Sequence, residues 1–105
     1  MMEKEDNIKH IGKEDNCIYI GNKEFMNYVT GTVMRFTTGD AKEITIKARG
    51  KLISRAVDVA QVAVNKFLKD KIEIKDVKIG SEELENKMKK MVSVSFIEIL
   101  IVKVG

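Results

Sequence analysis

Basic side chains are concentrated between positions 47 and 55, and their chemistry is that of phosphate binding. The four cations are Lys47, Arg49, Lys51 and Arg55. They span the point where an expected strand turns at Gly50 into an expected helix, and the free N–H groups and positive dipole of a helix start favour an anion. Arg49 can contact a phosphate through two parallel hydrogen bonds, and Lys51 and Arg55 share one helix face. A solvated turn is the alternative, but cations at a helix start are unfavourable without an anion, which favours a phosphate site.

A second group of cations lies near the C-terminus. Lys87, Lys89 and Lys90 are interleaved with Met88 and Met91 in an expected connection between two strands. A basic arm with an apolar tip could follow a nucleic-acid groove. Three glutamates between positions 82 and 85 precede these lysines, so a solvated loop whose lysines protect strand edges accounts for them equally well.

Catalytic and metal-binding constellations are missing from the sequence. The single cysteine, Cys17, excludes an internal disulfide framework, and His10 with Cys17 is too few ligands for a metal site. No nucleophile and base pair or phosphate-cradling glycine loop is recognisable. We therefore expect no enzyme, no metal and no cofactor. Phe67, at the end of an expected helix, fits either the core or a protein contact.

The elements that must position these residues follow from hydrophobic periodicity. Alternation with period two predicts strands, and apolar residues three or four apart predict helices. The expected strands are 17–20, 43–47, 71–80 and 92–104, with helices at about 24–37 and 53–68. Gly21 and Asn22 provide a stop and a candidate N-cap, and Gly39 ends the first helix. A phase slip between Ile74 and Val77 indicates a bulge or a twist. The last two strands flank a polar connection at 81–91 as an extended hairpin arm.

The order predicts an α+β fold, a β-α-β-α-β-β two-layer sandwich with a four-stranded sheet, two helices and the arm. The 105 residues suffice for one domain, and self-association would help so small a core. Residues 1–16, with a net charge of −2, are expected to be a flexible acidic tail, and residues 17–105 carry 16 basic and 11 acidic side chains, or +5. No apolar run is long enough for a membrane helix, so we expect no membrane association and a cytoplasmic protein.

Several motifs in order resemble the Alba family, the small DNA- and RNA-binding chromatin proteins of archaea. The resemblance runs from about residue 18 to residue 103. It is carried by IGNK at 20–23, MNYV at 26–29, IKARGK at 46–51, NKFL at 65–68, IEIK at 72–75 and IEI at 97–99. The family typically has Gly-Lys-Lys-Pro where this chain has Gly21-Asn22-Lys23-Glu24, and Ser93 replaces a frequent arginine.

The resemblance implies a homodimer that coats or compacts double-stranded DNA on the chromosome with little sequence specificity. Residues that would contact nucleic acid are Lys23, Lys47, Arg49, Lys51 and Arg55 in the body and Lys87, Lys89 and Lys90 in the arm. Contacts between dimers would involve Asn65, Lys66 and Phe67. Two alternatives stay open: an RNA-binding or RNA-chaperone protein, and a protein-interaction module with incidental nucleic-acid binding.

Overall fold

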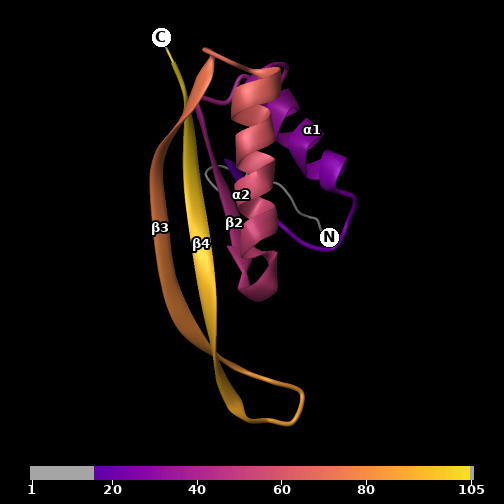
Figure 1. Cartoon of the computed structure of the whole chain (residues 1–105), viewed down its shortest axis with the longest axis vertical. Coiled ribbons are helices and arrows are strands. Elements are labelled where there is room, and N and C mark those ends of the chain that lie inside the picture. Colours follow the sequence, from indigo (N-terminus) through magenta and orange to yellow (C-terminus); the bar gives the residue numbers. More distant parts are fainter. Residues whose placement is uncertain (1–15, 105) are drawn as a thin grey trace.

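The computed structural model describes residues 16–104 as two helices packed on one face of a four-stranded sheet (Figure 1). The elements are β1 (Cys17–Tyr19), α1 (Phe25–Phe36), β2 (Glu43–Arg49), α2 (Ile53–Val62), β3 (Ile72–Glu85) and β4 (Met91–Lys103). The sheet order is β1-β2-β4-β3, with β1 parallel to β2 and the other neighbours antiparallel. The expected α+β fold is confirmed. Residues 1–15 of the expected tail lie outside the described residues.

Alternation along the central strands builds the core. Ile44, Ile46 and Ala48 of β2 are buried toward the helices, while the residues between them point to the opposite side. Ile99 and Ile101 of β4 lie directly opposite Ile46 and Ile44 and are also buried. We call the sheet face away from the helices the outer face. Because strand residues alternate strictly, the outer face receives Lys47 and Arg49.

The first helix ends at the predicted glycine, but its N-cap is not the predicted residue. Its N-cap position is Glu24, which makes no side-chain capping bond, so the expectation of a cap at Asn22 was wrong. Gly39 does close the helix: its N–H donates to the Met34 carbonyl, and a Cβ there would lie 2.9 Å from the Arg35 carbonyl oxygen. A glycine is therefore required at this close approach.

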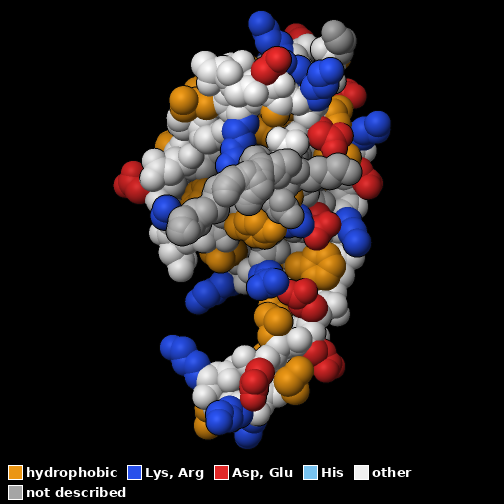
Figure 2. Space-filling view, turned by 180° about the vertical axis from the view of Figure 1, so that it is seen from behind, with side chains coloured by type: hydrophobic (Ala, Val, Ile, Leu, Met, Phe, Trp, Pro, Cys, Tyr) orange, Lys and Arg blue, Asp and Glu red, His pale blue; other side chains and the backbone are white. Residues whose placement is uncertain are grey.

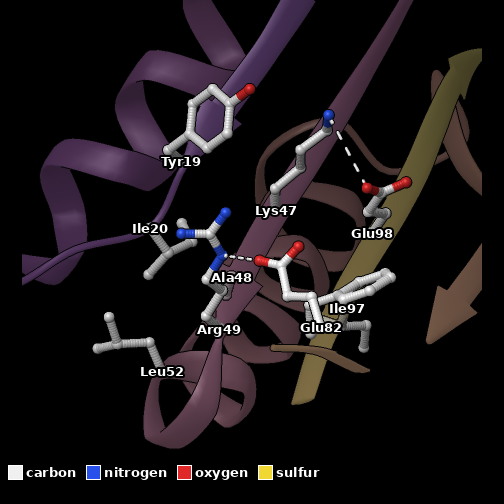
Figure 3. Close-up of a pocket in the computed structure, with 10 residues that line it drawn as sticks. Tyr19, Ile20, Lys47, Ala48, Arg49, Leu52, Glu82, Ile97 and Glu98 are labelled. Carbon is white, nitrogen blue, oxygen red and sulfur yellow. Dashed lines mark ion pairs between the residues drawn. The ribbon is translucent and has the colours of Figure 1, made fainter. Parts of the chain in front are cut away.

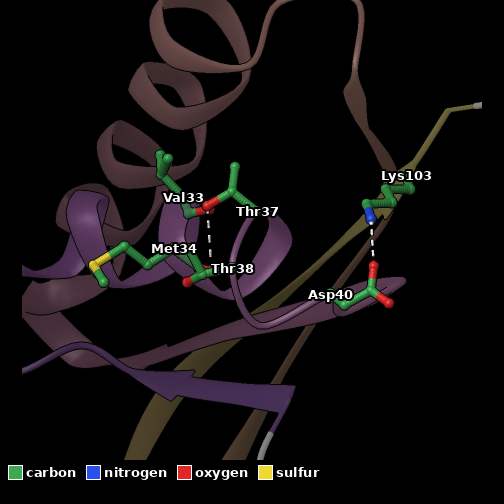
Figure 4. A network of polar contacts seen from close by, with 6 residues as sticks. All are labelled: Val33, Met34, Thr37, Thr38, Asp40 and Lys103. Carbon is green, nitrogen blue, oxygen red and sulfur yellow. Dashed lines mark hydrogen bonds and ion pairs between the residues drawn. The ribbon is translucent and has the colours of Figure 1, made fainter.

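Hydroxyl groups complete the same helix end (Figure 4). Thr37 Oγ1 donates to the Val33 carbonyl at 3.0 Å, and Thr38 Oγ1 donates to the Met34 carbonyl at 3.1 Å. Both carbonyls also accept a backbone N–H, from Thr37 and Gly39 respectively, so each hydroxyl adds a second hydrogen bond at the helix end. An ion pair of 3.2 Å between Asp40 and Lys103 then joins the loop after α1 to the end of β4.

The second helix has the expected extent, but its last turn is wider than an α-helix. A 3₁₀ turn at Gly50–Leu52 precedes α2, and a π-helical segment, Ala63–Phe67, follows it. The Leu68 N–H accordingly donates to the Ala63 carbonyl, five residues earlier. Leu68 is buried while Phe67 is 52% exposed, so Leu68 belongs to the core and Phe67 does not.

The hairpin of β3 and β4 is longer than the sequence indicated. β3 continues to Glu85, and only residues 86–90 connect it to β4, so the prediction of a polar connection over 81–91 was wrong. Residues 81–85 lie beyond the helix layer, where only Glu82 and Leu84 are half-buried and no run of alternating apolar residues in the sequence marks a strand (Figure 1). The pairing of β3 with β4 has a register shift between Ile74 and Asp76, which confirms that the strand is irregular at the predicted place.

Candidate nucleic-acid interface

The turn from β2 into α2 presents the first group of cations. Gly50 has φ +57°, a left-handed conformation that other residues adopt only with strain, and it reverses the chain after Arg49. Lys51 follows in the 3₁₀ turn and is exposed, with no ion-pair partner among residues 16–104. The backbone therefore places the end of β2 and the start of α2 at one end of the body, as the spacing predicted.

A hydrogen-bond network joins the loop after β1 to this turn. The Tyr28 hydroxyl accepts bonds from the N–H of Gly21 at 2.9 Å and of Lys23 at 3.1 Å. Arg55 Nη2 donates to the Lys23 carbonyl, and the Arg55 guanidinium lies 5.9 Å from the ring centroids of both Phe25 and Tyr28. Arg55 therefore positions the loop that carries Lys23. A direct contact of Arg55 with phosphate stays a prediction.

Two other predicted cations lie on the outer face, each beside a carboxylate (Figure 3). Lys47 Nζ is 3.8 Å from Glu98 Oε2 of β4, and Arg49 Nε is 2.7 Å from Glu82 Oε1 of β3. The Arg49 side chain is still 61% exposed, whereas that of Glu82 is 37% exposed. Arg49 is thus reachable from solvent, but a phosphate would compete with Glu82 for it.

These ion pairs border a hollow of about 560 Å³, which we call the outer-face pocket. Its lining includes Tyr19, Lys47, Arg49, Glu82, Phe96 and Glu98. The residues come from all four strands, and the labelled side chains converge on it in Figure 3. The pocket therefore combines aromatic rings with two cations and two carboxylates.

The tip of the arm presents the second group of cations. Asn86 shapes the tip, because its side-chain oxygen accepts bonds from the N–H of Met88 at 2.9 Å and of Lys90 at 3.0 Å. Lys87, Lys89 and Lys90 are exposed, as is Met88 at 75%. Seen from the side opposite to Figure 1, Lys and Arg side chains flank the notch between the body and the bent tip (Figure 2).

The third predicted group lies elsewhere. Asn65, Lys66 and Phe67 are exposed in the π-helical segment, where the Asn65 amide donates to the Gln61 side chain. Figure 1 places this end of the helix at the opposite end of the body from the arm tip. The structure therefore separates the predicted nucleic-acid residues from the predicted contact between dimers.

Sequence reasoning missed the residues that support these cations. Tyr28 and Asn86 organise the two loops through backbone hydrogen bonds, and Glu82 and Glu98 are the partners of the outer-face cations. An Asn at the start of a tight connection is a recognisable turn signal. The partnership of Arg49 with Glu82 depends on strand register and has no local signal.

Two further findings concern only the described part of the chain. Between residues 16 and 104, no group of three or more His, Cys, Asp and Glu side chains is arranged to hold a metal ion. Nor does any helix in that range have the length and apolar character needed to cross a membrane.

Comparison with known proteins gives consistent matches. A family model described as Alba matches residues 16–81. The chain is 51% identical over 88 residues to the DNA/RNA-binding protein Alba of Methanocella arvoryzae, covering 84% of this chain and 90% of that protein. It is 40% identical over 89 residues to the protein of the same name from Methanococcus maripaludis, covering 85% and 99%.

Two solved structures share the fold of this chain. Alba from Thermoplasma volcanium superposes with a TM-score of 0.76 at 40% identity, covering 83% of this chain and 99% of that one. ALBA1 from Trypanosoma brucei has a TM-score of 0.66 at 20% identity over 85% of this chain and 69% of that one, which shows a shared fold.

Proposed function

The chain belongs to the Alba family, and from this premise we propose that it is a non-enzymatic protein that binds double-stranded DNA as a homodimer. It coats or compacts the duplex on the chromosome with little sequence specificity. The observation that carries the proposal is the placement of exposed cations on both sides of the notch between body and arm. The relatives it resembles are named DNA/RNA-binding proteins.

The mechanism is phosphate neutralisation at two places. Lys51 at the turn, together with Lys23 and Arg49, meets one stretch of the backbone, and the exposed lysines of the arm tip meet another. Lys and Arg contacts to phosphate position a protein on a duplex and carry no base information. Little sequence preference follows, because these cations contact a feature that every duplex shares.

Dimerisation is supported by an apolar surface beyond the helix layer. Val77 and Ile79 of β3 lie opposite the buried Ile99 and Ile97 of β4 and therefore point to the helix side of the sheet. They are nevertheless 51% and 74% exposed. A second copy of the chain would remove them from water.

Light scattering of the purified protein tests the dimer. A dimer has twice the 11.9 kDa mass of the chain, and Ile79→Glu should convert it to the single-chain mass because a charge would be buried in the contact. A wild-type protein with the single-chain mass would contradict the dimer.

Substitution of two body cations tests the interface. We expect Arg49→Ala with Lys51→Ala to weaken binding by the same factor on duplexes of unrelated sequence. Each phosphate contact contributes about 0.9 to the salt slope and Glu82 competes for Arg49, so the slope should become shallower by about 0.9 to 1.8 per chain. The matched control is Lys69→Ala with Lys71→Ala, which removes the same charge from two exposed lysines beyond the far end of α2. Equal effects of the two pairs would refute this interface.

RNA is the second candidate ligand, because the relatives' names include it. Competition between duplex DNA and RNA of equal length at one salt concentration separates the two. The duplex proposal expects DNA to displace RNA at equimolar concentration, and displacement of DNA by RNA would favour the second candidate.

A further inference from the structure

The outer-face pocket is not explained by phosphate binding. Its two cations, Lys47 and Arg49, each lie beside a carboxylate, Glu98 and Glu82. The four side chains together have no net charge. A phosphate entering the pocket would approach both carboxylates, and like charges that close are unfavourable. The pocket therefore fits an uncharged polar group better than an anion.

The hydrogen-bonding groups in the pocket suit a flat heterocycle with both donors and acceptors. The carboxylates of Glu82 and Glu98 accept hydrogen bonds, and the Lys47 ammonium and Arg49 guanidinium donate them. The edges of nucleobases offer N–H donors and carbonyl or ring-nitrogen acceptors side by side. A volume of about 560 Å³ is within the usual range for a pocket that holds a small organic group.

Tyr19 supplies a stacking surface at the same place. It is 67% exposed, although aromatic rings of this size are normally well covered, and it lines the pocket from β1. Lys47, its partner in the β1–β2 register, lies 5.6 Å from the ring centroid. Unpaired bases stack on such exposed rings in single-strand-binding proteins.

We propose that the outer-face pocket binds an unpaired nucleobase, stacked against Tyr19 with its polar edge toward Glu82 and Glu98. The inference rests on the proposed function and extends it to single-stranded segments of the nucleic acid. Bases inside a duplex are stacked and paired, so they cannot enter without being extruded. The pocket therefore strengthens the binding of single strands only, while the cations at the notch contact the phosphates of single strands and duplexes alike.

The test compares Tyr19→Ala with wild type, by fluorescence anisotropy, on a single-stranded oligonucleotide and on a duplex. Stacking contributes about 1–3 kcal/mol per base, so single-strand binding should weaken by about 5- to 150-fold. Duplex binding should change by less than about twofold. Tyr19→Phe keeps the ring and should retain single-strand affinity, which separates stacking from a role of the hydroxyl.

Two controls make the result specific. Met34→Ala removes another exposed apolar side chain, on α1, and should leave both affinities unchanged. An abasic strand keeps the phosphates but has no base to stack, so wild type and Tyr19→Ala should bind it equally. Equal loss on single strand and duplex, or no loss at all, would overturn the pocket proposal. A wild-type protein that binds neither ligand would overturn the proposed function itself.

Discussion

Replacing Glu82 by glutamine should strengthen duplex binding, because the Glu82 carboxylate forms an ion pair with Arg49. The distance between Glu82 Oε1 and Arg49 Nε is 2.7 Å. A phosphate that contacts Arg49 must first displace Glu82. The two side chains are 61% and 37% exposed, and ion pairs so open to solvent contribute about 0.2–1 kcal/mol. Removing the competitor should therefore raise the affinity by about 1.4- to 5-fold.

The salt dependence of duplex binding by Glu82→Gln is a second, independent test of the same idea. Because Glu82 no longer competes, Arg49 should contact phosphate more fully than in the wild type, and the slope of log K against log salt should become steeper by up to about 0.9 per chain. Fluorescence anisotropy with a labelled duplex at several salt concentrations measures both quantities. Circular dichroism melting should show little change, since the pair is exposed.

Glu83→Gln is the matched control for Glu82→Gln. It removes the same charge one residue along β3, but strand alternation points Glu83 to the other face, away from Arg49. If the gain came only from removing one negative charge from β3, both variants would bind the duplex more tightly by the same factor. If Glu82→Gln and Glu83→Gln cannot be distinguished in affinity and slope, the competition between Glu82 and phosphate is refuted.

Three further predictions concern the supports of the interface. Gly80→Ala should lower the free energy of unfolding by about 0.5–1.5 kcal/mol in urea denaturation, because its Cβ would lie 2.7 Å from the outer end of the Phe96 ring, which would have to leave its preferred rotamer, and an unchanged midpoint would contradict this packing. Asn86→Ala removes two hydrogen bonds that shape the arm tip, so amide exchange at 86–90 should accelerate and duplex affinity fall; unchanged exchange would show that the tip holds without it. Tyr28→Phe removes the acceptor of two backbone N–H groups, one part-buried and one exposed, and should destabilise by about 0.5–1.5 kcal/mol, measured by thermal melting against wild type; no shift would mean that water replaces the hydroxyl.

Most of the fold could be predicted from the sequence because the buried residues recur along the chain with the regular spacing of strands and helices. Ile44 and Ile46 alternate with polar residues in β2, and the four-residue spacing of Phe25, Val29 and Val33 marks α1. The irregularity in β3 also left a phase slip that could be seen, between Ile74 and Val77. Each of these signals is local, so no knowledge of the tertiary structure was needed.

The arm and the helix cap could not be predicted in the same way. Residues 81–85 pair with β4 without being buried by the helices, so backbone hydrogen bonds determine the strand and no hydrophobic pattern records it. Asn22 has the side chain of a good cap, but the chain enters α1 two residues later, at Glu24. Local propensity was overridden there by the loop that Tyr28 and Arg55 hold.

The candidate site was predictable as a set of cations but not as a set of contacts. Lys51 and the arm lysines stand out by residue type and spacing, and their roles stay predictions until binding is measured. The pairing of Arg49 with Glu82 joins residues 33 positions apart in sequence and follows from register and side-chain reach. Arg55 looked like a phosphate ligand by spacing, yet its guanidinium is directed to the Lys23 carbonyl and two aromatic rings.

The salt dependence of duplex binding by the wild-type chain tests the central claim most directly. Lys51, Lys87, Lys89 and Lys90 are exposed and have no ion-pair partner in the described part of the chain. At about 0.9 per phosphate, these four contacts predict a slope of log K against log salt of about −3.6 per chain, or about −7 for the proposed dimer with both chains in contact, between about 50 and 200 mM salt. A slope shallower than about −1, or no binding at the lowest salt, would contradict phosphate neutralisation as the basis of binding.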